Sequence, residues 1–214
     1  MSAMTDETSR TPWPFAMHVA EKIISELAPF CDHVEIAGSL RRRRETVKDI
    51  EILAIPRLGP QPTDLFKQPF GIRDDYLMNY LATALNMPAP MWTLRPSKVG
   101  GTSFGNLNKL LVYRSGLPQC PEIAVDVFTG TVENWGRDLW IRTGPAAWNT
   151  ACAARAQVMG MQMHAYGPSS FTRDSLPVCC PTEEDFARVL EITPPPPTAR
   201  TDEAAKSLYL RRQA

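Results

Sequence analysis

Apolar residues recur at two different spacings along the chain, and these spacings predict where helices and strands lie. From Pro14 to Phe30 they follow a helical repeat with charged residues between them, and Pro29 ends this predicted helix. Short runs rich in β-branched residues predict strands. The predicted strands cover 34–37, 50–55, 109–113 and 123–128; the later predicted helices cover 74–85, 146–158 and a segment that begins at Thr182, where Asp185 completes a capping-box pattern.

Proline-rich stretches separate these elements. Residues 57–69 are rich in Pro and Gln and are typical of a loop, and a turn at 115–118 would join two of the strands. After residue 158 the pattern predicts irregular structure rich in Met, Ser and Pro. Prolines 194–197 predict a stiff linker to a short basic tail.

Composition narrows the class of protein. With 214 residues and 43% hydrophobic residues the chain can bury a sizeable core, and 23 basic residues balance 23 acidic ones, so any nucleic-acid surface must come from local clustering. No apolar run approaches the length of a membrane helix, the first residues are polar, and the 5 cysteines include no C-x-x-C pair. We therefore expect a globular protein of a reducing compartment, cytoplasmic and without a membrane contact.

Three short pieces carry the chemistry. Gly38-Ser39 follows the first predicted strand, where glycine permits close approach of a ligand and the free N–H groups of a helix start attract phosphate. Asp49 and Glu51 lie two apart in a strand, so their carboxylates share one face. Asp126 lies inside another apolar strand. Adjacent carboxylates repel unless a cation lies between them, and their hard oxygens suit Mg²⁺ or Mn²⁺.

Each piece alone has a simpler interpretation. An Asp-x-Glu pair is usually the solvated face of an edge strand, a run of arginines is usually a solvated basic turn, and a single strand aspartate is usually a cap or an edge residue. Their ordered combination favours a metal-and-phosphate site. Two divalent ions bridged by carboxylates support phosphoryl or nucleotidyl transfer.

The same combination resembles the nucleotidyltransferase superfamily, and within it the family X DNA polymerases. The segment 34–53 is similar to the palm motif of bacterial members, while Asn134-Trp135-Gly136, Thr143-Gly144 and Asn149 resemble their palm-to-thumb junction. The resemblance implies an α+β fold. Its expected parts are an N-terminal helix in 1–30, a nucleotidyltransferase palm in 31–142, a small α/β thumb in 143–200 and a basic tail in 201–214.

The resemblance also implies roles for individual residues. Asp49, Glu51 and Asp126 would be the catalytic carboxylates that hold two Mg²⁺ ions, with Mn²⁺ able to substitute, and Asp126 would lie beside the primer hydroxyl. The nucleotide-binding residues would be Gly38, Ser39, Arg42, Lys48, Thr143, Gly144 and Asn149. The DNA-binding residues would be Arg41, Arg43, Arg44, Arg142 and Arg155, and the grip on DNA would also draw on Lys98, Lys109, Arg137 and the basic tail.

Five positions depart from the family's pattern. Glu51 stands where members usually have Asp, and Lys48 where they have glycine. Ile141-Arg142 replaces an aromatic pair that discriminates against ribose, so the choice between dNTP and NTP is open. Ala124 replaces a basic residue two positions before the third acid.

The resemblance predicts a minimal palm-plus-thumb DNA polymerase that fills short gaps in DNA repair. The segment before residue 34 is too short for the family's lyase domain, and we find neither its Gly-hydrophobic-Gly hairpin nor its phosphoesterase domain. The expected partners are gapped or primer-template DNA and a dNTP, with the enzyme a monomer in the cytoplasm, on the nucleoid, or in a host cell if viral. Two alternatives remain: a template-independent or other-substrate nucleotidyltransferase, and a catalytically silent nucleic-acid-binding module.

Overall fold

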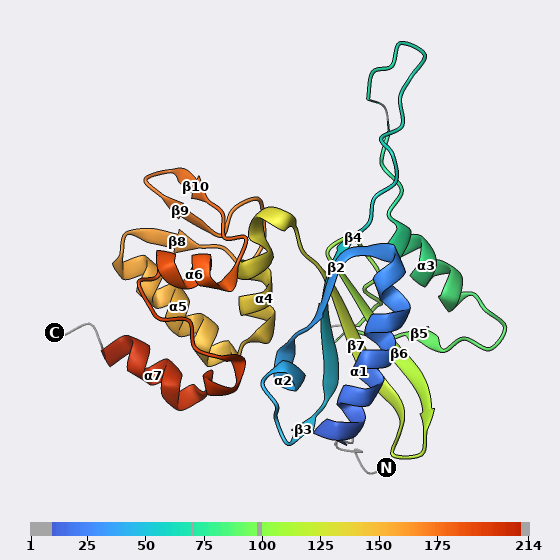
Figure 1. Ribbon diagram of the computed structural model, residues 1–214, viewed down its shortest axis with the longest axis horizontal. Helices are drawn as coiled ribbons and strands as arrows, with labels where there is room; N and C mark the ends of the chain where they lie inside the picture. Colours follow the sequence, from blue (N-terminus) through green and yellow to red (C-terminus); the bar gives the residue numbers. More distant parts are fainter. Residues whose placement is uncertain (1–9, 70, 98–99, 211–214) are drawn as a thin grey trace.

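The chain folds into two lobes (Figure 1). The computed structural model describes residues 10–69, 71–97 and 100–210. The first lobe is built on a mixed sheet flanked by helices, and the second is smaller and mostly helical. This architecture confirms the α+β class expected from the sequence. Among the described residues, no helix has both the length and the apolar character needed to span a bilayer.

The first lobe contains a five-stranded sheet in the order β2-β4-β7-β6-β5. At its centre β4 and β7 run parallel, whereas every other neighbouring pair is antiparallel. The four predicted strands are all present in this sheet, with longer bounds, and β5 is too short to produce a recognisable alternation. Strand β2 spans Cys31–Ile36, β4 spans Asp49–Pro56, β5 spans Trp92–Leu94, β6 spans Asn108–Leu117 and β7 spans Cys120–Thr129.

The β6–β7 hairpin turns later than the sequence predicts. Strand β6 continues through the expected turn to Leu117, which pairs with Cys120. The pairing register shifts between Arg114 and Leu117, and Gly116 within this bulge has a φ of 72°. Gly116, inside the segment predicted as a turn, therefore provides the positive φ of a β-bulge.

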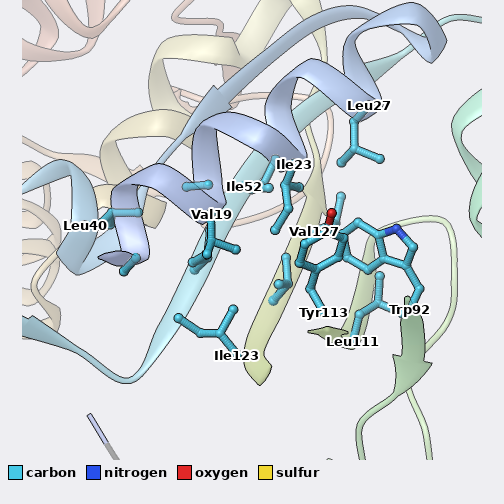
Figure 2. Packing of buried hydrophobic residues seen from close by; sticks show 14 of the residues in the cluster. Val19, Ile23, Leu27, Leu40, Ile52, Trp92, Leu111, Tyr113, Ile123 and Val127 are labelled. Carbon is cyan, nitrogen blue, oxygen red and sulfur yellow. The ribbon is translucent and has the colours of Figure 1, made fainter. Parts of the chain in front are cut away.

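Helix α1 covers one face of the sheet. It spans Trp13–Leu27, and Val19 and Ile23 are one helical turn apart on the same side. Both side chains are fully buried and face Ile52 of β4 and Val127 of β7 (Figure 2). The predicted helix is confirmed, and its last part, which contains Pro29, is a 3₁₀ turn.

The other helix of the sheet lobe, α3, spans Tyr76–Leu85 and confirms the helix predicted at 74–85. Asp75 caps it by accepting a hydrogen bond of 2.8 Å from the Met78 N–H. The shorter elements of this lobe are β1 (Thr11–Pro12), η1 (Ala28–Phe30), α2 (Gly38–Arg41), β3 (Thr46–Val47) and η2 (Val132–Asn134).

Residues 57–69 and 71–75 form a long excursion between β4 and α3, which we call the arm (Figure 1). Its two limbs are connected by the isolated bridges Leu58–Asp75 and Thr63–Pro69. The arm confirms the loop predicted for 57–69. It lies apart from both lobes (Figure 1).

Helix α4, Trp135–Thr143, joins the two lobes. Leu139 packs with Leu53 and Phe128 against the sheet, whereas the next residue, Trp140, lies in the core of the second lobe. Consecutive residues of one helix thus belong to two cores, which places the lobes close together.

The second lobe surrounds an aromatic core in which Trp140, Trp148, Phe171 and Phe186 are in ring contact. The predicted helix at 146–158 is confirmed, and so is the capping box at Thr182. Its elements are α5 (Ala146–Val158), β8 (Met161–Met163), β9 (Phe171–Arg173), β10 (Leu176–Val178), α6 (Glu183–Val189), η3 (Pro197–Ala199) and α7 (Asp202–Leu210).

Two segments of this lobe differ from the sequence expectation. Part of the stretch predicted as irregular is the three-stranded antiparallel sheet β8-β9-β10, whose strands are too short to show an alternating pattern. The expected tail 201–214 contains helix α7, which packs on α5 through buried Ala205 and Leu208. The arginines expected at its end, Arg211 and Arg212, lie outside the described residues, as does Lys98.

Candidate active site

The three predicted carboxylates lie on the two central strands of the sheet. In the parallel pairing of β4 with β7, Glu51 is the direct partner of Asp126, and Asp49 is the partner of Ala124. Residues two apart in a strand share a face. The structure therefore brings Asp49, Glu51 and Asp126 together on one face, whereas the strand pattern alone required this only of Asp49 and Glu51.

The opposite face of the same two strands is apolar. Ile50 and Ile52 of β4 and Val125 and Val127 of β7 are fully buried in the core. On the carboxylate face, α4 covers the far end of the two strands, where Leu53 and Phe128 pack with Leu139. The acids thus lie at the end of this face that α4 leaves uncovered.

Gly38 is required by its contact with Glu51. It begins α2 directly after β2 with a φ of 67°, and a Cβ built on it would lie 1.9 Å from Glu51 Oε2. The preceding residue, Ala37, donates its N–H to the carbonyl oxygen of Glu51 at 2.8 Å. Any side chain at position 38 would displace the carboxylate, so the Gly-Ser motif and the acid pair form one unit.

The acids have shifted proton affinities. Burial, followed by the neighbouring charges of Asp49 and Asp126, raises the pKa of Glu51 to about 7. Burial also raises the pKa of Asp126, while its hydrogen bond with Arg95 opposes that rise. Burial is thus the largest cause of both rises, and the neighbouring carboxylates add to it against the opposing arginines.

Arg95 is a member of this site that the sequence reasoning missed. It follows β5, its N–H donates to the Leu110 carbonyl at 3.0 Å, and its guanidinium Nη2 forms an ion pair with Asp126 Oδ1. Its Nε is buried without a hydrogen-bond partner. The resemblance implies a basic residue where this chain has Ala124, which is a signal that another residue could supply the charge. It did not indicate which residue supplies the charge, because β5 lies two strands away.

A basic cavity of about 580 Å³ adjoins the carboxylates. Its lining includes Asp49 and Glu51. It also includes Ser39, Arg42 and Lys48, which the resemblance predicts to bind the nucleotide. The remaining lining residues are Arg10, Arg44, Glu45 and Thr46. A polar, positively charged hollow beside acids suits a polyphosphate chain held next to metal ions.

Arg42 lies between this cavity and the inter-lobe bend. Its Nη1 donates to the Thr143 carbonyl oxygen, and a Cβ on Gly144 would lie 3.4 Å from that nitrogen. The Arg42 Nε is buried without a partner, and burial lowers the pKa of the guanidinium. Thr143 and Gly144 are therefore connected to the basic cavity through Arg42. Gly144 has a φ of 58°, which favours glycine.

Two further predicted residues lie at the start of the second lobe. Asn149 donates from Nδ2 to the Ile141 carbonyl at 2.8 Å, and its Oδ1 is buried without a partner. Arg142 lies 3.6 Å above the Phe128 ring and donates to the Tyr166 hydroxyl at 2.8 Å. Its positive charge lowers the proton affinity of Glu51 and Asp126, which places it on the side of the carboxylates.

Some of the arginines predicted to contact DNA are exposed, whereas others are engaged in hydrogen bonds within the protein. Arg43 and Arg44 are exposed in the loop after α2. Arg41 instead donates two hydrogen bonds to the Glu183 carboxylate, at 3.0 and 2.8 Å, and one to the Thr143 hydroxyl at 2.9 Å.

Arg155 donates to the Leu190 and Glu191 carbonyl oxygens beyond the end of α6. Arg41 and Arg155 thus hold the fold together, a use that an arginine's sequence position does not reveal. Two other basic residues that were predicted to help grip DNA, one lysine and one arginine, are also engaged within the fold. Lys109 is buried and donates to the Thr129 hydroxyl at 3.4 Å, and Arg137 is buried against Asp138.

The carboxylates do not form a ready-made metal cage. Within the described ranges, no group of three or more His, Cys, Asp or Glu side chains is arranged to hold an ion. Asp126 is paired with Arg95, and Glu51 is packed against Gly38. The donor chemistry nevertheless fits a hard divalent cation, because these neighbouring acids raise the pKa of Glu51 in addition to its burial and their oxygens are the ligands that Mg²⁺ prefers.

The chain was also compared with known proteins. No protein-family model matches it, and no curated protein matches it significantly.

Proposed function

We propose that this protein is a nucleotidyltransferase of the family X DNA polymerase type, which adds nucleotides to a primer 3′-hydroxyl and releases pyrophosphate. The observation that carries the proposal is the pairing of Glu51 with Asp126 on neighbouring parallel strands, next to a basic cavity that Ser39, Arg42 and Lys48 line. We further propose that it fills short gaps in DNA repair.

In this proposal the chain's own residues perform three tasks. Ser39, Arg42 and Lys48 bind the triphosphate in the basic cavity, with Arg42 as a charge-assisted donor. Asp126 lies where the primer hydroxyl enters and accepts its proton. Asp49, Glu51 and Asp126 would hold Mg²⁺, which when bound stabilises the negative charge of the triphosphate and of the attacking oxygen.

Template contacts would come from the second lobe. Asn149 has a buried, unpartnered Oδ1, and Thr143-Gly144 form the bend beside the phosphate cavity. The exposed Arg43 and Arg44 supply a salt-sensitive contact to the DNA backbone.

One observation favours a second candidate, a nucleotidyl transfer that uses no template. Arg41 and Arg155 are engaged in bonds within the protein, which leaves fewer cations for a grip on duplex DNA. Such an enzyme would extend a primer end or modify another hydroxyl acceptor with the same carboxylates.

Primer extension on one-nucleotide-gapped DNA separates these candidates. Each dNTP and NTP is supplied singly, with Mg²⁺ and then with Mn²⁺, and Asp126→Asn serves as the inactive control. We expect insertion of the complementary nucleotide only. Addition of any nucleotide regardless of the template base would favour the template-independent enzyme, and the absence of addition with either metal would contradict the proposal.

A further inference from the structure

A second basic cavity lies where the two lobes meet. Its volume is about 290 Å³, and its lining includes four arginines: Arg42, Arg43 and Arg44 of the sheet lobe and Arg200 of the second lobe. Figure 1 shows the two stretches that supply them side by side, the loop after α2 and the segment that leads into α7. The cavity therefore exists only because the lobes are packed together.

Positive charge dominates this lining, although the chain as a whole is neutral. Among the described lining residues, Glu45 is the one acid against the four arginines. In the part of the chain that the structure describes, none of Arg42, Arg43 and Arg44 forms an ion pair with a carboxylate. Unpaired guanidinium groups around a partly enclosed space produce a positive potential, which attracts an anion.

Arg200 is fixed in place rather than solvated. Its side chain is 1% exposed, and its guanidinium lies 4.0 Å above the Trp140 ring. The guanidinium donates to a Glu183 carboxylate oxygen at 2.8 Å and to the Pro195 carbonyl oxygen at 3.3 Å. The same Glu183 carboxylate accepts two hydrogen bonds from Arg41. One carboxylate thus serves two guanidinium groups, so this network keeps an uncompensated positive charge beside the cavity.

Arg42 lines this cavity as well as the one beside the carboxylates. Its Nε is buried without a hydrogen-bond partner. Burial lowers the pKa of Arg42, and so do the charges of Arg44 and Arg200, against the opposing charges of Glu51 and Asp202. An anion bound here would relieve the crowding of positive charge and accept charge-assisted hydrogen bonds.

Two threonines of the second lobe also line the cavity. The Thr201 hydroxyl accepts a hydrogen bond of 3.1 Å from the Ala204 N–H. Thr198 is exposed, and its hydroxyl has no hydrogen-bond partner among the residues that the structure describes. Guanidinium and hydroxyl groups can all donate to phosphoryl oxygens, so the lining suits an anion of the phosphate class.

The size and the depth of the cavity favour a small, free anion. Its volume of about 290 Å³ is at the lower limit for small-molecule sites, which favours an anion of the size of pyrophosphate over a whole nucleotide. Arg43 and Arg44 are exposed and can also contact DNA, but a strand on the surface would not need the buried Arg200. A free oligophosphate can use both the exposed and the buried arginines.

We propose that the second basic cavity binds inorganic pyrophosphate or another small oligophosphate. The anion accepts hydrogen bonds from arginines of the sheet lobe and from Thr198 of the second lobe, so its binding also joins the lobes. Asp49 and Glu51, which line the other cavity, are not among the described residues that line this one. The site is therefore separate from the carboxylates, and the inference does not depend on the proposed transferase activity.

The test is isothermal titration calorimetry of the full chain with pyrophosphate in metal-depleted buffer, without DNA or nucleotide. Every protein carries Lys48→Glu, because Lys48 lines only the cavity beside the carboxylates and a negative charge there keeps pyrophosphate out of it. We expect this chain to bind one pyrophosphate. A second substitution, Thr198→Glu, should weaken the binding about tenfold or more by charge repulsion, whereas the matched uncharged variant Thr198→Gln should bind as before.

Thr198 and Lys48 are both exposed, so all variants should melt at the same temperature without an anion, which thermal denaturation checks. Absence of pyrophosphate binding to the Lys48→Glu chain, or equal binding by the Thr198→Glu and Thr198→Gln variants, would overturn the inference. Sulfate binding as tight as that of pyrophosphate would indicate an adventitious ion only, with the same consequence. A single-stranded oligonucleotide that displaces pyrophosphate from the Thr198→Gln variant would assign the cavity to a nucleic-acid strand and would also overturn it.

Discussion

The two faces of the β4–β7 pair are built from alternate residues of the same two strands, yet one face is apolar and buried whereas the other carries neighbouring acids. On one face Ile50, Ile52, Val125 and Val127 are fully buried under α1. On the other face Asp49, Glu51 and Asp126 lie together, and burial, followed by the charges of the other two acids, raises the pKa of Glu51 to about 7.

The difference between the two faces explains how β4 and β7 remain stable although they carry three neighbouring carboxylates. Each isoleucine of the apolar face contributes about 1.5–3 kcal/mol of burial free energy. That stabilisation lets the carboxylate face hold a repulsive cluster that would be costly on its own. We therefore expect changes on one face to alter activity and changes on the other to alter stability.

The largest effect is expected at the third acid. Asp126→Ala removes a carboxylate that no neighbour replaces, so nucleotide insertion should fall by about a thousandfold or more, equivalent to about 4 kcal/mol of barrier. Single-turnover gap filling measures this loss. Glu122→Ala is the control, since Glu122 lies on the same strand in an exposed ion pair with Arg114 and should retain full activity. Full activity of Asp126→Ala would refute the assignment of the site.

The opposite face is tested by Ile52→Ala. Because Ile52 is fully buried between α1 and β7, its truncation should lower the free energy of unfolding by about 2–5 kcal/mol. Urea denaturation measures the change, with the exposed arm residue substitution Ile72→Ala as a control that should change it little. Activity per folded molecule should stay near that of the unmodified chain; a loss comparable to that of Asp126→Ala would mean that the two faces are not separable.

Arg95, which follows β5, contributes to the carboxylate face from outside the β4–β7 pair. Arg95→Ala removes the ion pair that orients Asp126, and we expect activity to fall about 10–100-fold, as for other groups that position a ligand residue. The pKa of Asp126 should rise further, so the acid limb of the pH–rate profile should move to higher pH. Arg95→Lys should restore part of both effects. An unchanged pH profile would reduce Arg95 to a purely structural role.

The smallest expected effect is the pH dependence of stability. The pKa of Glu51 is about 7 in the folded protein against an ordinary 4.5, so the folded state binds a proton that the unfolded state releases. Stability should be highest below pH 4.5, fall as the pH rises to 7, and then level off with respect to this group. Glu51→Gln should remove this decline in urea denaturation across that range. An equally steep decline in the variant would assign it to other groups.

Local patterns predicted much of this fold because they depend on neighbouring residues alone. The helix at 146–158 and the capping box at Thr182 follow from spacing and hydrogen-bonding chemistry within a few residues. The β8-β9-β10 sheet escaped because strands of three residues carry no measurable alternation. Helix α7 was missed because its packing on α5, rather than a strong local pattern, stabilises it.

The features of the candidate site also fall into those that local sequence predicts and those that depend on long-range contacts. The sequence by itself determined that Asp49 and Glu51 share a face and that Gly38-Ser39 lies where a strand ends and a helix begins, since both follow from strand and backbone geometry. Only the tertiary structure decided that Glu51 pairs with Asp126 and that Arg95 neutralises Asp126. It also decided that Arg41 serves Glu183 rather than lying open to a ligand. These contacts join residues that are distant in the chain. The order of the strands and the packing of the two lobes bring those residues together, and no local pattern encodes either of them.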